Sequence, residues 1–282
     1  MITKTYIALA CCVLGLCGCT QDSSSLRDAL IFHASFDESV DADTAAGDAA
    51  MHTAISREES RLGNHRADVA LAAGAGRFGG ALSMGKKDRQ YIYYEGYENM
   101  GYKSADWQGA YSLWMKLDPD EDLEPGYCDP FQVTDKTPQN EAMFLEFSKD
   151  HTPRRLRLAA CPTLKEWNTT GGKWEELEIA DRPVVEVMDP PFSRDTWTHV
   201  VVTFENFNTG RPDGRACLYI NGQPSGVISG WTQIYRWDPA KARMKIGWSY
   251  IGLMDDLAVF NRALTPEEVK RLYNAPKGLE GL

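Results

Sequence analysis

The 282-residue sequence lacks the signatures of the best-defined catalytic and metal sites. It contains no Gly-x-Ser-x-Gly elbow, no Walker-type phosphate loop and no His-Glu-x-x-His helix. Its five histidines stand at positions 33, 52, 65, 151 and 199, and no two have the spacing of metal ligands. The sequence therefore gives little support to a zinc site, a serine hydrolase or a phosphate-loop enzyme.

Positive charge is also scarce. The 30 Lys and Arg are outnumbered by 40 Asp and Glu, which gives a net charge of −10. This balance argues against nucleic acid or an anionic membrane surface as the main partner. The hydrophobic fraction of 43% and the charged fraction of 25% are typical of a globular protein. The length suits one large all-β domain, and no repeat or linker divides residues 29–274.

Long apolar runs are missing apart from one near the N-terminus. Tyr6 to Leu16 is unbroken but too short to span a bilayer, and it follows a short positive segment, as in a signal peptide. The next letters, LCGC, resemble a bacterial lipobox, which would make Cys19 the lipidated first mature residue. Cleavage of an ordinary signal peptide nearby is the alternative. We expect a signal peptide at 1–18, a lipid-anchored tether at 19–28, a domain at 29–276 and a tail at 277–282. The residues after Cys19 favour the outer membrane of a bacterial cell envelope.

Cysteine is rare in the expected mature chain. Four of the seven cysteines lie in or at the end of the signal, which leaves Cys128, Cys161 and Cys217. An exported protein meets an oxidising compartment, so one disulfide is expected. We predict that it joins Cys128 to Cys161. Cys217 lies in an apolar strand and is expected to be a small buried hydrophobe.

The rest of the chain reads as many short strands separated by Gly and Asn turns. Examples are Ala29–Phe36, Trp107–Leu117 and Trp197–Phe204, while the polar segment 47–75 has weak periodicity and reads as an excursion. Thr265, followed by Pro266 and Glu268, predicts a capping box that opens a helix. The pattern predicts an all-β, two-sheet antiparallel sandwich with one short C-terminal helix.

Four segments, in this order, carry a resemblance to a known family. They read LIFHASFDES, GRFGGALSM, WTHVVVTFENFNTGRPDGRACLYINGQPSG and GLMDDLAVFNRALTPEEVKRLY. The chain resembles the LamG-like (laminin G type) jelly-roll family of the concanavalin A-like lectin and glucanase superfamily. This resemblance implies two sheets packed face to face, with the chain ends close together. Members include carbohydrate-binding modules, adhesion domains, glycoside hydrolases and polysaccharide lyases.

Two adjacent carboxylates, Asp255 and Asp256, lie in a strand that is apolar on both sides. A buried carboxylate needs hydrogen bonds, a cation or a proton. Many LamG-like domains hold one Ca²⁺ where the first and last strands meet, so the resemblance implies a structural Ca²⁺ site formed by Asp37 with Asp255 or Asp256. Alternatively, Asp37 caps a turn, and Asp255 pairs with Arg262 or with a backbone amide.

A catalytic role has weak sequence support. The β-glucan-cleaving members of the superfamily carry Glu-x-Asp-x-x-Glu on one strand, and Glu176, Glu178 and Asp181 repeat only its spacing. No recognisable catalytic motif is present, and a solvated edge strand explains these acids as well. A glycoside hydrolase or polysaccharide lyase is therefore the alternative function. A structural or adhesion protein that binds another protein is a third.

Aromatic residues are the stronger functional signal, because sugar rings stack on Trp and Tyr. One cluster contains Tyr93, Tyr94, Tyr97 and Tyr102. A second places Trp231, Gln233, Tyr235 and Trp237 at alternate positions, and Trp167 and Trp174 lie in a polar insert. These six residues, from the second cluster and the polar insert, are the predicted ligand-binding residues. We expect a non-catalytic domain that recognises a polysaccharide or glycoconjugate.

Overall fold

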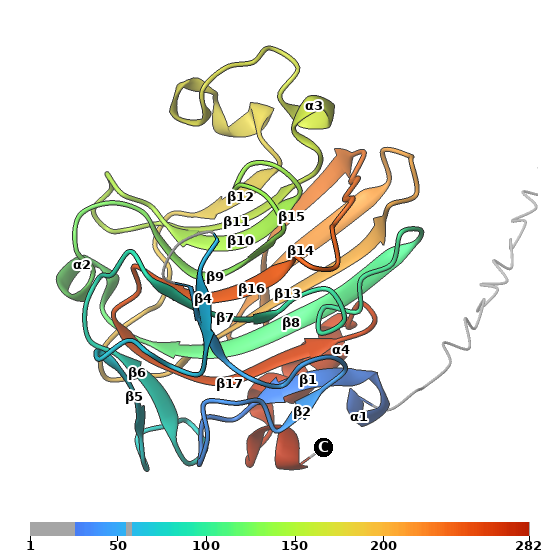
Figure 1. Ribbon diagram of the computed structural model, residues 1–282. Coiled ribbons are helices and arrows are strands. Elements are labelled where there is room, and N and C mark those ends of the chain that lie inside the picture. The colour runs from blue at the N-terminus through green and yellow to red at the C-terminus, as the bar shows by residue number, and fades with distance from the viewer. Residues whose placement is uncertain (1–25, 55–57, 282) are drawn as a thin grey trace, which may run out of the picture.

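The computed structural model describes residues 26–54 and 58–281, and it confirms the predicted two-sheet antiparallel jelly roll. The sheets lie one above the other (Figure 1). The first has nine strands in the order β15-β14-β13-β8-β17-β1-β2, and β6, followed by β5, pairs on β17. In that order the strands are Gln223–Trp231, Gly214–Ile220, Thr198–Phe207, Trp107–Lys116, Gly252–Phe260, Leu30–Ala34, Thr44–Ala45, Ala81–Met84 and Val69–Ala72.

The second sheet has eight strands in the order β12-β11-β10-β9-β16-β7-β3-β4. These strands are Val184–Val187, Leu156–Cys161, Ala142–Phe147, Cys128–Thr134, Arg243–Trp248, Tyr91–Glu95, His52–Ala54 and Ser60–Leu62. Short helices occur in the connections and at the ends: α1 Leu26–Ala29, α2 Pro119–Asp122, α3 Leu164–Trp167, α4 Pro266–Asn274, and the 3-10 turns η1 Trp174–Glu176, η2 Ile179–Asp181 and η3 Gly278–Gly281.

The main core fills the space between the sheets, because alternate residues of each strand point inward. Tyr111 of β8 stacks on Phe131 of β9, with ring centroids 4.3 Å apart, so an aromatic pair bridges the two layers. At one end, Trp107 packs edge-on against Phe204 and Trp237. The outer faces of both sheets are therefore left for other contacts.

The ends of the domain meet as predicted. β1 pairs antiparallel with β17, with Phe32 opposite Val259. α4 begins with the predicted capping box: the Thr265 hydroxyl accepts the Glu268 amide at 3.2 Å, and the Glu268 carboxylate accepts the Thr265 amide at 2.9 Å. Figure 1 places α1, β1, α4 and the C-terminus together at one edge of the molecule. The packed region extends from Leu26 to η3, beyond the predicted limits of 29–276.

Several local predictions were wrong. The expected excursion contains β3, β4 and β5, because very short edge strands leave little periodicity in the sequence. The stretch with Glu176, Glu178 and Asp181 forms η1, η2 and their flanks, so these acids do not alternate along a strand as in the glucanase pattern.

The predicted disulfide does not form. Cys128 and Cys161 are free and buried. Across β10, Cys128 lies opposite Phe147 and Cys161 opposite Ala142, at the two ends of that strand. Five residues of extended strand span roughly 16 Å, whereas a disulfide needs Cα atoms within about 7 Å. The sequence does not reveal the distance between Cys128 and Cys161, because the register of β9, β10 and β11 sets it.

The expected signal peptide and the lipidated Cys19 lie outside the described residues. Within the described part of the chain, none of the helices has the length and apolar character needed to cross a membrane.

Candidate functional site

Four of the predicted ligand-binding residues, here called the aromatic ladder, do not form an exposed stacking surface: Trp231, Gln233, Tyr235 and Trp237. β15 ends at Trp231, so the following residues lack the alternation that would point them to one side. Gln233 and Tyr235 are 1% exposed and Trp237 is 5% exposed, while Trp231 packs against the core from a partly buried position. This segment crosses from one sheet to the other and turns these side chains inward, so their alternate positions do not form one exposed surface.

The other two predicted ligand-binding residues, Trp167 and Trp174, are also buried. The two indoles pack edge-to-face, with centroids 5.6 Å apart, and are 5% and 6% exposed. They cover Phe144 and Ala159 on the outer face of β10 and β11. In Figure 1 the loop that carries α3 rises beyond β10, β11 and β12. These tryptophans therefore shield part of the sheet instead of lining a binding groove.

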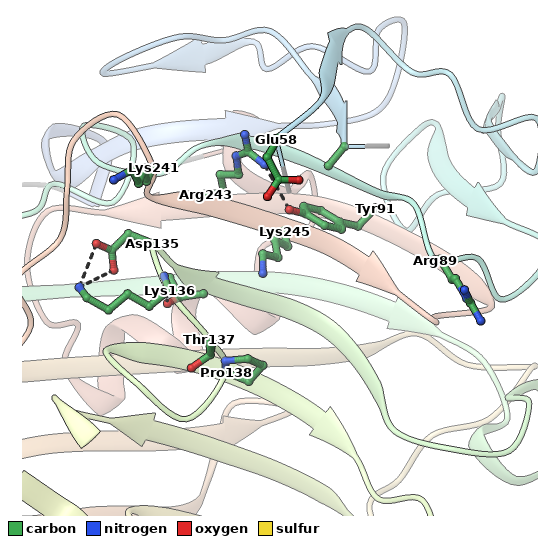
Figure 2. A pocket seen from close by; sticks show the side chains of 12 residues that line it. Glu58, Arg89, Tyr91, Asp135, Lys136, Thr137, Pro138, Lys241, Arg243 and Lys245 are labelled. Carbon is green, nitrogen blue, oxygen red and sulfur yellow. Dashed lines mark hydrogen bonds and ion pairs between the residues drawn. The ribbon is translucent and has the colours of Figure 1, made fainter. Parts of the chain in front are cut away.

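The remaining outer face of the eight-stranded sheet contains a pocket of about 530 Å³. Such a volume is typical of small-ligand sites. Its floor is formed by Arg243 and Lys245 of β16 and by Tyr91 of β7, and Figure 2 shows these side chains close together. Lys136, from the turn after β9, lies across from them. The other lining residues are Ala54, Glu58, Arg89, Thr134, Asp135, Thr137, Pro138 and Lys241.

The strand register explains why these residues share a face. Lys245 lies opposite Gln132 of β9 and Tyr93 of β7, and Arg243 lies opposite Thr134. Between them, Met244 points into the core. The alternation Arg-Met-Lys on β16 thus directs two cations outward and one thioether inward.

The pocket lining has more cations than carboxylates, although the chain as a whole is acidic. Five cationic residues line it against two carboxylates, Glu58 and Asp135. Asp135 is bonded to Lys136 at 2.9 Å, and Lys136 also binds Glu141 at 2.6 Å. The floor cations have different partners. Arg243 donates to the Tyr91 hydroxyl at 3.2 Å, and its guanidinium lies 4.3 Å from the Tyr93 ring centroid.

Lys245 links the pocket to a buried polar track along the sheet. Its ammonium lies 5.0 Å from the Tyr91 ring centroid and donates to Gln132 Oε1 at 2.8 Å. Gln132 in turn donates to Asp129 at 2.7 Å. These bonds fix the Lys245 side chain, so the floor of the pocket is ordered before any ligand arrives.

Beyond Asp129 the track continues to Glu146, Arg157 and Glu186 on the next strands. Burial, together with the nearby Glu146 charge, raises the pKa of Asp129 well above its usual value. Burial raises the pKa of Glu146 to about 7, against the opposing effect of Arg157, 3.0 Å away. The two acids are only 3% and 6% exposed. Such covered groups are poorly placed to reach a glycosidic bond.

The adjacent acids Asp255 and Asp256 have separate partners. Asp255 is fully buried and accepts the Phe78 amide at 3.0 Å, which is the backbone-amide alternative. Asp256 has a left-handed backbone, with φ of 48°, and binds His33 at 2.8 Å. The bulge between Asp255 and Ala258 separates the two side chains. Asp255 and Asp256 therefore have different partners, and a Ca²⁺ site that includes Asp256 stays a prediction.

Asp37 does reach the loop that holds Asp255. It accepts the Gly80 amide at 2.5 Å, and a Cβ on Gly79 would lie 2.3 Å from its Oδ1. A Cβ on Gly76 would lie 2.8 Å from Asp255 Oδ2. The glycines thus allow one loop to wrap around both carboxylates.

The chemistry of this loop fits a hard cation. Asp255 Oδ1 is buried without a hydrogen-bond partner, and burial raises the pKa of this carboxyl to about 7. A bound cation would satisfy the orphan oxygen and favour ionisation. Asp37 and Asp255 would supply carboxylate oxygens, supplemented by backbone carbonyls. Among the described residues, no three His, Cys, Asp or Glu side chains gather at a metal-site distance.

The two strand histidines, His33 and His199, have structural partners. His199 is 1% exposed and bonds the Ser112 hydroxyl at 2.8 Å, and burial lowers its pKa to about 3. His33 is paired with Asp256. Burial opposes the charged form of His33, but its pKa is raised because the bond and charge of Asp256 outweigh that effect.

Residues 108–270, more than half of the chain, match the concanavalin A-like lectin/glucanases superfamily. The chain belongs to this superfamily. No curated protein matched the chain.

Solved structures support the same fold for this superfamily member. Domain 4 of AbnA, a GH43 extracellular arabinanase from Geobacillus stearothermophilus solved with arabinotriose, is 19% identical, with a TM-score of 0.54 over 87% of this chain and 98% of that one. The binding domain of botulinum neurotoxin DC, solved in complex with SialylT, is 11% identical, with a TM-score of 0.56 over 89% of this chain and 52% of that one. The superfamily member thus spans about half of the toxin chain. At these identities the likeness is one of fold.

The residues of the cationic pocket were missed in the sequence. Tyr91 and Tyr93, and Arg243 and Lys245, alternate with core residues on their strands, which was a usable signal. Nothing in the sequence indicates that β7 and β16 are neighbours, because about 150 residues separate them. The pairing of these strands in a superfamily jelly roll supplies that information.

Proposed function

We propose that this superfamily member recognises an acidic carbohydrate, such as a uronate-containing, sulfated or sialylated glycan, in the pocket floored by Tyr91, Arg243 and Lys245. The observation that carries the proposal is the set of five cations lining one pocket of a chain with net charge −10. Cationic side chains bind carboxylate and sulfate groups through charge-assisted hydrogen bonds. Tyr91 adds an aromatic surface for the C–H face of a sugar.

The structural neighbours are consistent with a carbohydrate ligand. The arabinanase domain was solved with arabinotriose, and one toxin binding domain with SialylT. Recognition without catalysis is part of the proposal, because a binding site needs only the fixed cations and the ring. The buried acids Asp129 and Glu146 then act as supports for Lys245 through Gln132.

Affinity electrophoresis and calorimetry on the chain from Ser23 onward test the proposal. Polygalacturonate, a sulfated glycan and sialyllactose serve as acidic probes, and a neutral glucan serves as the reference. Arg243→Gln should weaken binding of the retained acidic probe about tenfold, since a hydrogen bond to a charged group is worth about 1.5–3 kcal/mol. Binding should also weaken as salt rises.

A remote charge change is the matched control. Lys270 lies on the exposed side of α4, and Lys270→Gln alters the net charge by the same amount. It should leave binding unchanged. Equal binding by wild type and Arg243→Gln, or retention of the neutral glucan alone, would refute the assignment of an acidic ligand to this pocket.

We also propose that lipidation at Cys19 holds the domain at the outer membrane of a bacterial envelope. The proposal is supported by the lipobox-like LCGC and the polar residues that follow it. Labelling with an alkynyl fatty acid should mark the wild-type protein and leave Cys19→Ser unmarked. Equal labelling of both proteins, or absence of label from the wild type, would contradict the anchor.

A structural Ca²⁺ at Asp37 and Asp255 is the third part of the proposal. It is supported by the orphan Asp255 oxygen and by the glycine loop shared by both acids. Added Ca²⁺ should raise the Tm of the EDTA-treated protein by mass action, and Asp255→Asn should remove that rise. Asp48→Asn, in an exposed turn, should keep it. A Tm that is indifferent to Ca²⁺ in the wild type would contradict the site.

A further inference from the structure

A second hollow, distinct from the cationic pocket, lies at the end of the sandwich. It has a volume of about 530 Å³ and lies between the turn after β7, the loop between β13 and β14, and the segment that crosses from β15 to β16. Its lining includes Tyr97, Tyr102, Asn208, Tyr235, Arg236 and Trp237. None of the lining residues is a carboxylate, and Arg236 is the one formal cation among them.

The hollow brings together the two aromatic clusters seen in the sequence. The Tyr97 and Tyr102 rings are 4.8 Å apart, and Tyr102 stacks on Trp237 at 5.4 Å with an interplanar angle of 24°. Tyr97 and Tyr102 are partly exposed, whereas Tyr235 and Trp237 are buried beneath them. An aromatic surface with one accessible side is thus formed, although the crossing segment itself is not an exposed ladder.

Hydrogen bonds between the three segments, and from one of them to the turn before β10, make this hollow a fixed feature. Tyr102 donates to the Tyr235 carbonyl at 2.9 Å, and Trp237 donates through Nε1 to the Glu141 carbonyl at 2.8 Å. Asn208 accepts the Tyr235 amide at 2.7 Å and donates to the Lys103 carbonyl at 2.6 Å. The left-handed backbone of Asn208, with φ of 61°, turns the chain at the end of β13 so that its side chain reaches both. Little ordering is left for a ligand to impose.

The polar rim offers hydroxyl and guanidinium groups. Ser104 and Thr209 lie at the edge, and Arg236 donates from Nη1 to the Thr163 hydroxyl at 3.0 Å. Aromatic rings with hydroxyl and amide neighbours match the C–H faces and hydroxyls of a sugar ring. Because its lining has a single cation, this hollow should bind a polyanion more weakly than the cationic pocket does.

We propose that this hollow is a second carbohydrate subsite, specific for a neutral sugar unit that stacks on Tyr97 and Tyr102. The inference extends the proposed function to a second site of different chemistry, and rests on it only in the class of ligand. The crossing segment borders both sites: Arg236 and Trp237 line the hollow, Lys241 lines the cationic pocket, and the Arg236 carbonyl accepts Lys136 from that pocket at 3.0 Å. One glycan with acidic and neutral units fits this arrangement.

Saturation-transfer NMR and calorimetry with arabinotriose and lactose test the subsite on the chain from Ser23 onward. Wild type should bind at least one of these neutral probes, and Tyr97→Ala should weaken that binding about tenfold through loss of a stacking ring. Tyr97→Phe keeps the ring and should bind within about twofold of wild type. Ser104→Trp, at an exposed position, should block the hollow without touching the core.

The cationic pocket supplies the opposite control. Arg243→Gln should leave neutral-probe binding unchanged, and Tyr97→Ala should leave acidic-probe binding unchanged. Absence of neutral-probe binding by wild type, or wild-type affinity in both Tyr97→Ala and Ser104→Trp, would overturn the subsite whatever the acidic probes show. If the wild type binds a neutral probe but none of the acidic probes, the first proposal is overturned and this one stands.

Discussion

Glu146 and Glu186 form a natural pair for testing the polar track. Both carboxylates bind Arg157 on the outer face of the second sheet, at 3.0 and 2.7 Å. Glu146 is buried on the central side, where burial raises its pKa to about 7. Burial also opposes ionisation of Glu186, but bonds from Arg157 and Arg155 lower its pKa overall. The substitutions Glu146→Gln and Glu186→Gln keep the shape of each side chain and remove the titration.

The expected magnitude for Glu146 follows from its pKa. The ordinary value of 4.5 rises to about 7 in the folded protein, and each unit corresponds to about 1.4 kcal/mol, so the total is about 3 kcal/mol. Because the folded state holds this proton more tightly, Glu146 stabilises the fold fully below pH 4.5. That contribution disappears as the pH rises to about 7. The free energy of unfolding of Glu146→Gln, relative to wild type, should therefore increase over this window.

Glu186 should behave in the opposite way. Its pKa is lowered in the folded state, so its contribution to stability is present above the unfolded pKa and is lost as the pH falls through the folded one. Glu186→Gln should thus lose stability relative to wild type as the pH rises. The two substitutions remove the same charge from the two sides of Arg157, and only their burial and hydrogen bonding distinguish them.

Urea unfolding at about pH 3, 4, 5, 6, 7 and 8, followed by fluorescence, measures both differences. Opposite slopes are the expected result, below the ordinary pKa of 4.5 for Glu186→Gln and between 4.5 and about 7 for Glu146→Gln. The same slope for both, or a flat difference for Glu146→Gln between about pH 4.5 and 7, would refute the argument that burial dominates at Glu146. A change in the m-value between variants would show that the folded or unfolded state itself had altered.

Three further predictions follow from the packing. Tyr111 buries its hydroxyl without a hydrogen-bond partner, so Tyr111→Phe should raise the free energy of unfolding by about 1 kcal/mol; a clear loss in urea unfolding would show that the hydroxyl has a partner. Burial raises the pKa of both Cys128 and Cys161, so both thiols should resist a thiol reagent until the protein unfolds. A reductant should leave the Tm unchanged, and a decrease in Tm would indicate a disulfide. Gly79→Ala should lower the free energy of unfolding by about 3 kcal/mol, because Gly79 has a φ of 88° and an added Cβ would meet Asp37. Gly74→Ala, where the added Cβ has open space, should lower it by about 1 kcal/mol. Equal losses in urea unfolding would show that the Asp37 contact has no role.

The sequence predicted the scaffold well because its signals are local. The alternation of the strands and the capping box at Thr265 each depend on residues within a few positions of one another. The same holds for the turn that joins β14 to β15, where Asn221 and Gly222 both have positive φ. The pairing of the first and last strands followed from the family resemblance, and β1 lies against β17.

The candidate sites were predicted poorly because they depend on distant partners. In the sequence, Trp237 looks the same whether it is exposed for sugar binding or buried in the core. Only its contact with Trp107 shows that it is buried. Asp255 and Asp256 looked like one acidic pair, yet a bulge directs one to Phe78 and the other to His33. A single shift of register along a strand reverses the side on which each residue lies.

The sequence by itself determined the two-layer β architecture, the helix near its end and the acidic balance of the chain, since these follow from periodicity, capping and composition. The tertiary structure alone decided where charge and aromatic rings gather. It joined Tyr91 to Arg243 and Lys245, and Tyr97 to Trp237, from segments far apart in the chain. Strand order and register are set by the packing of the whole core, so an acidic protein can hold a cationic pocket that its composition does not reveal.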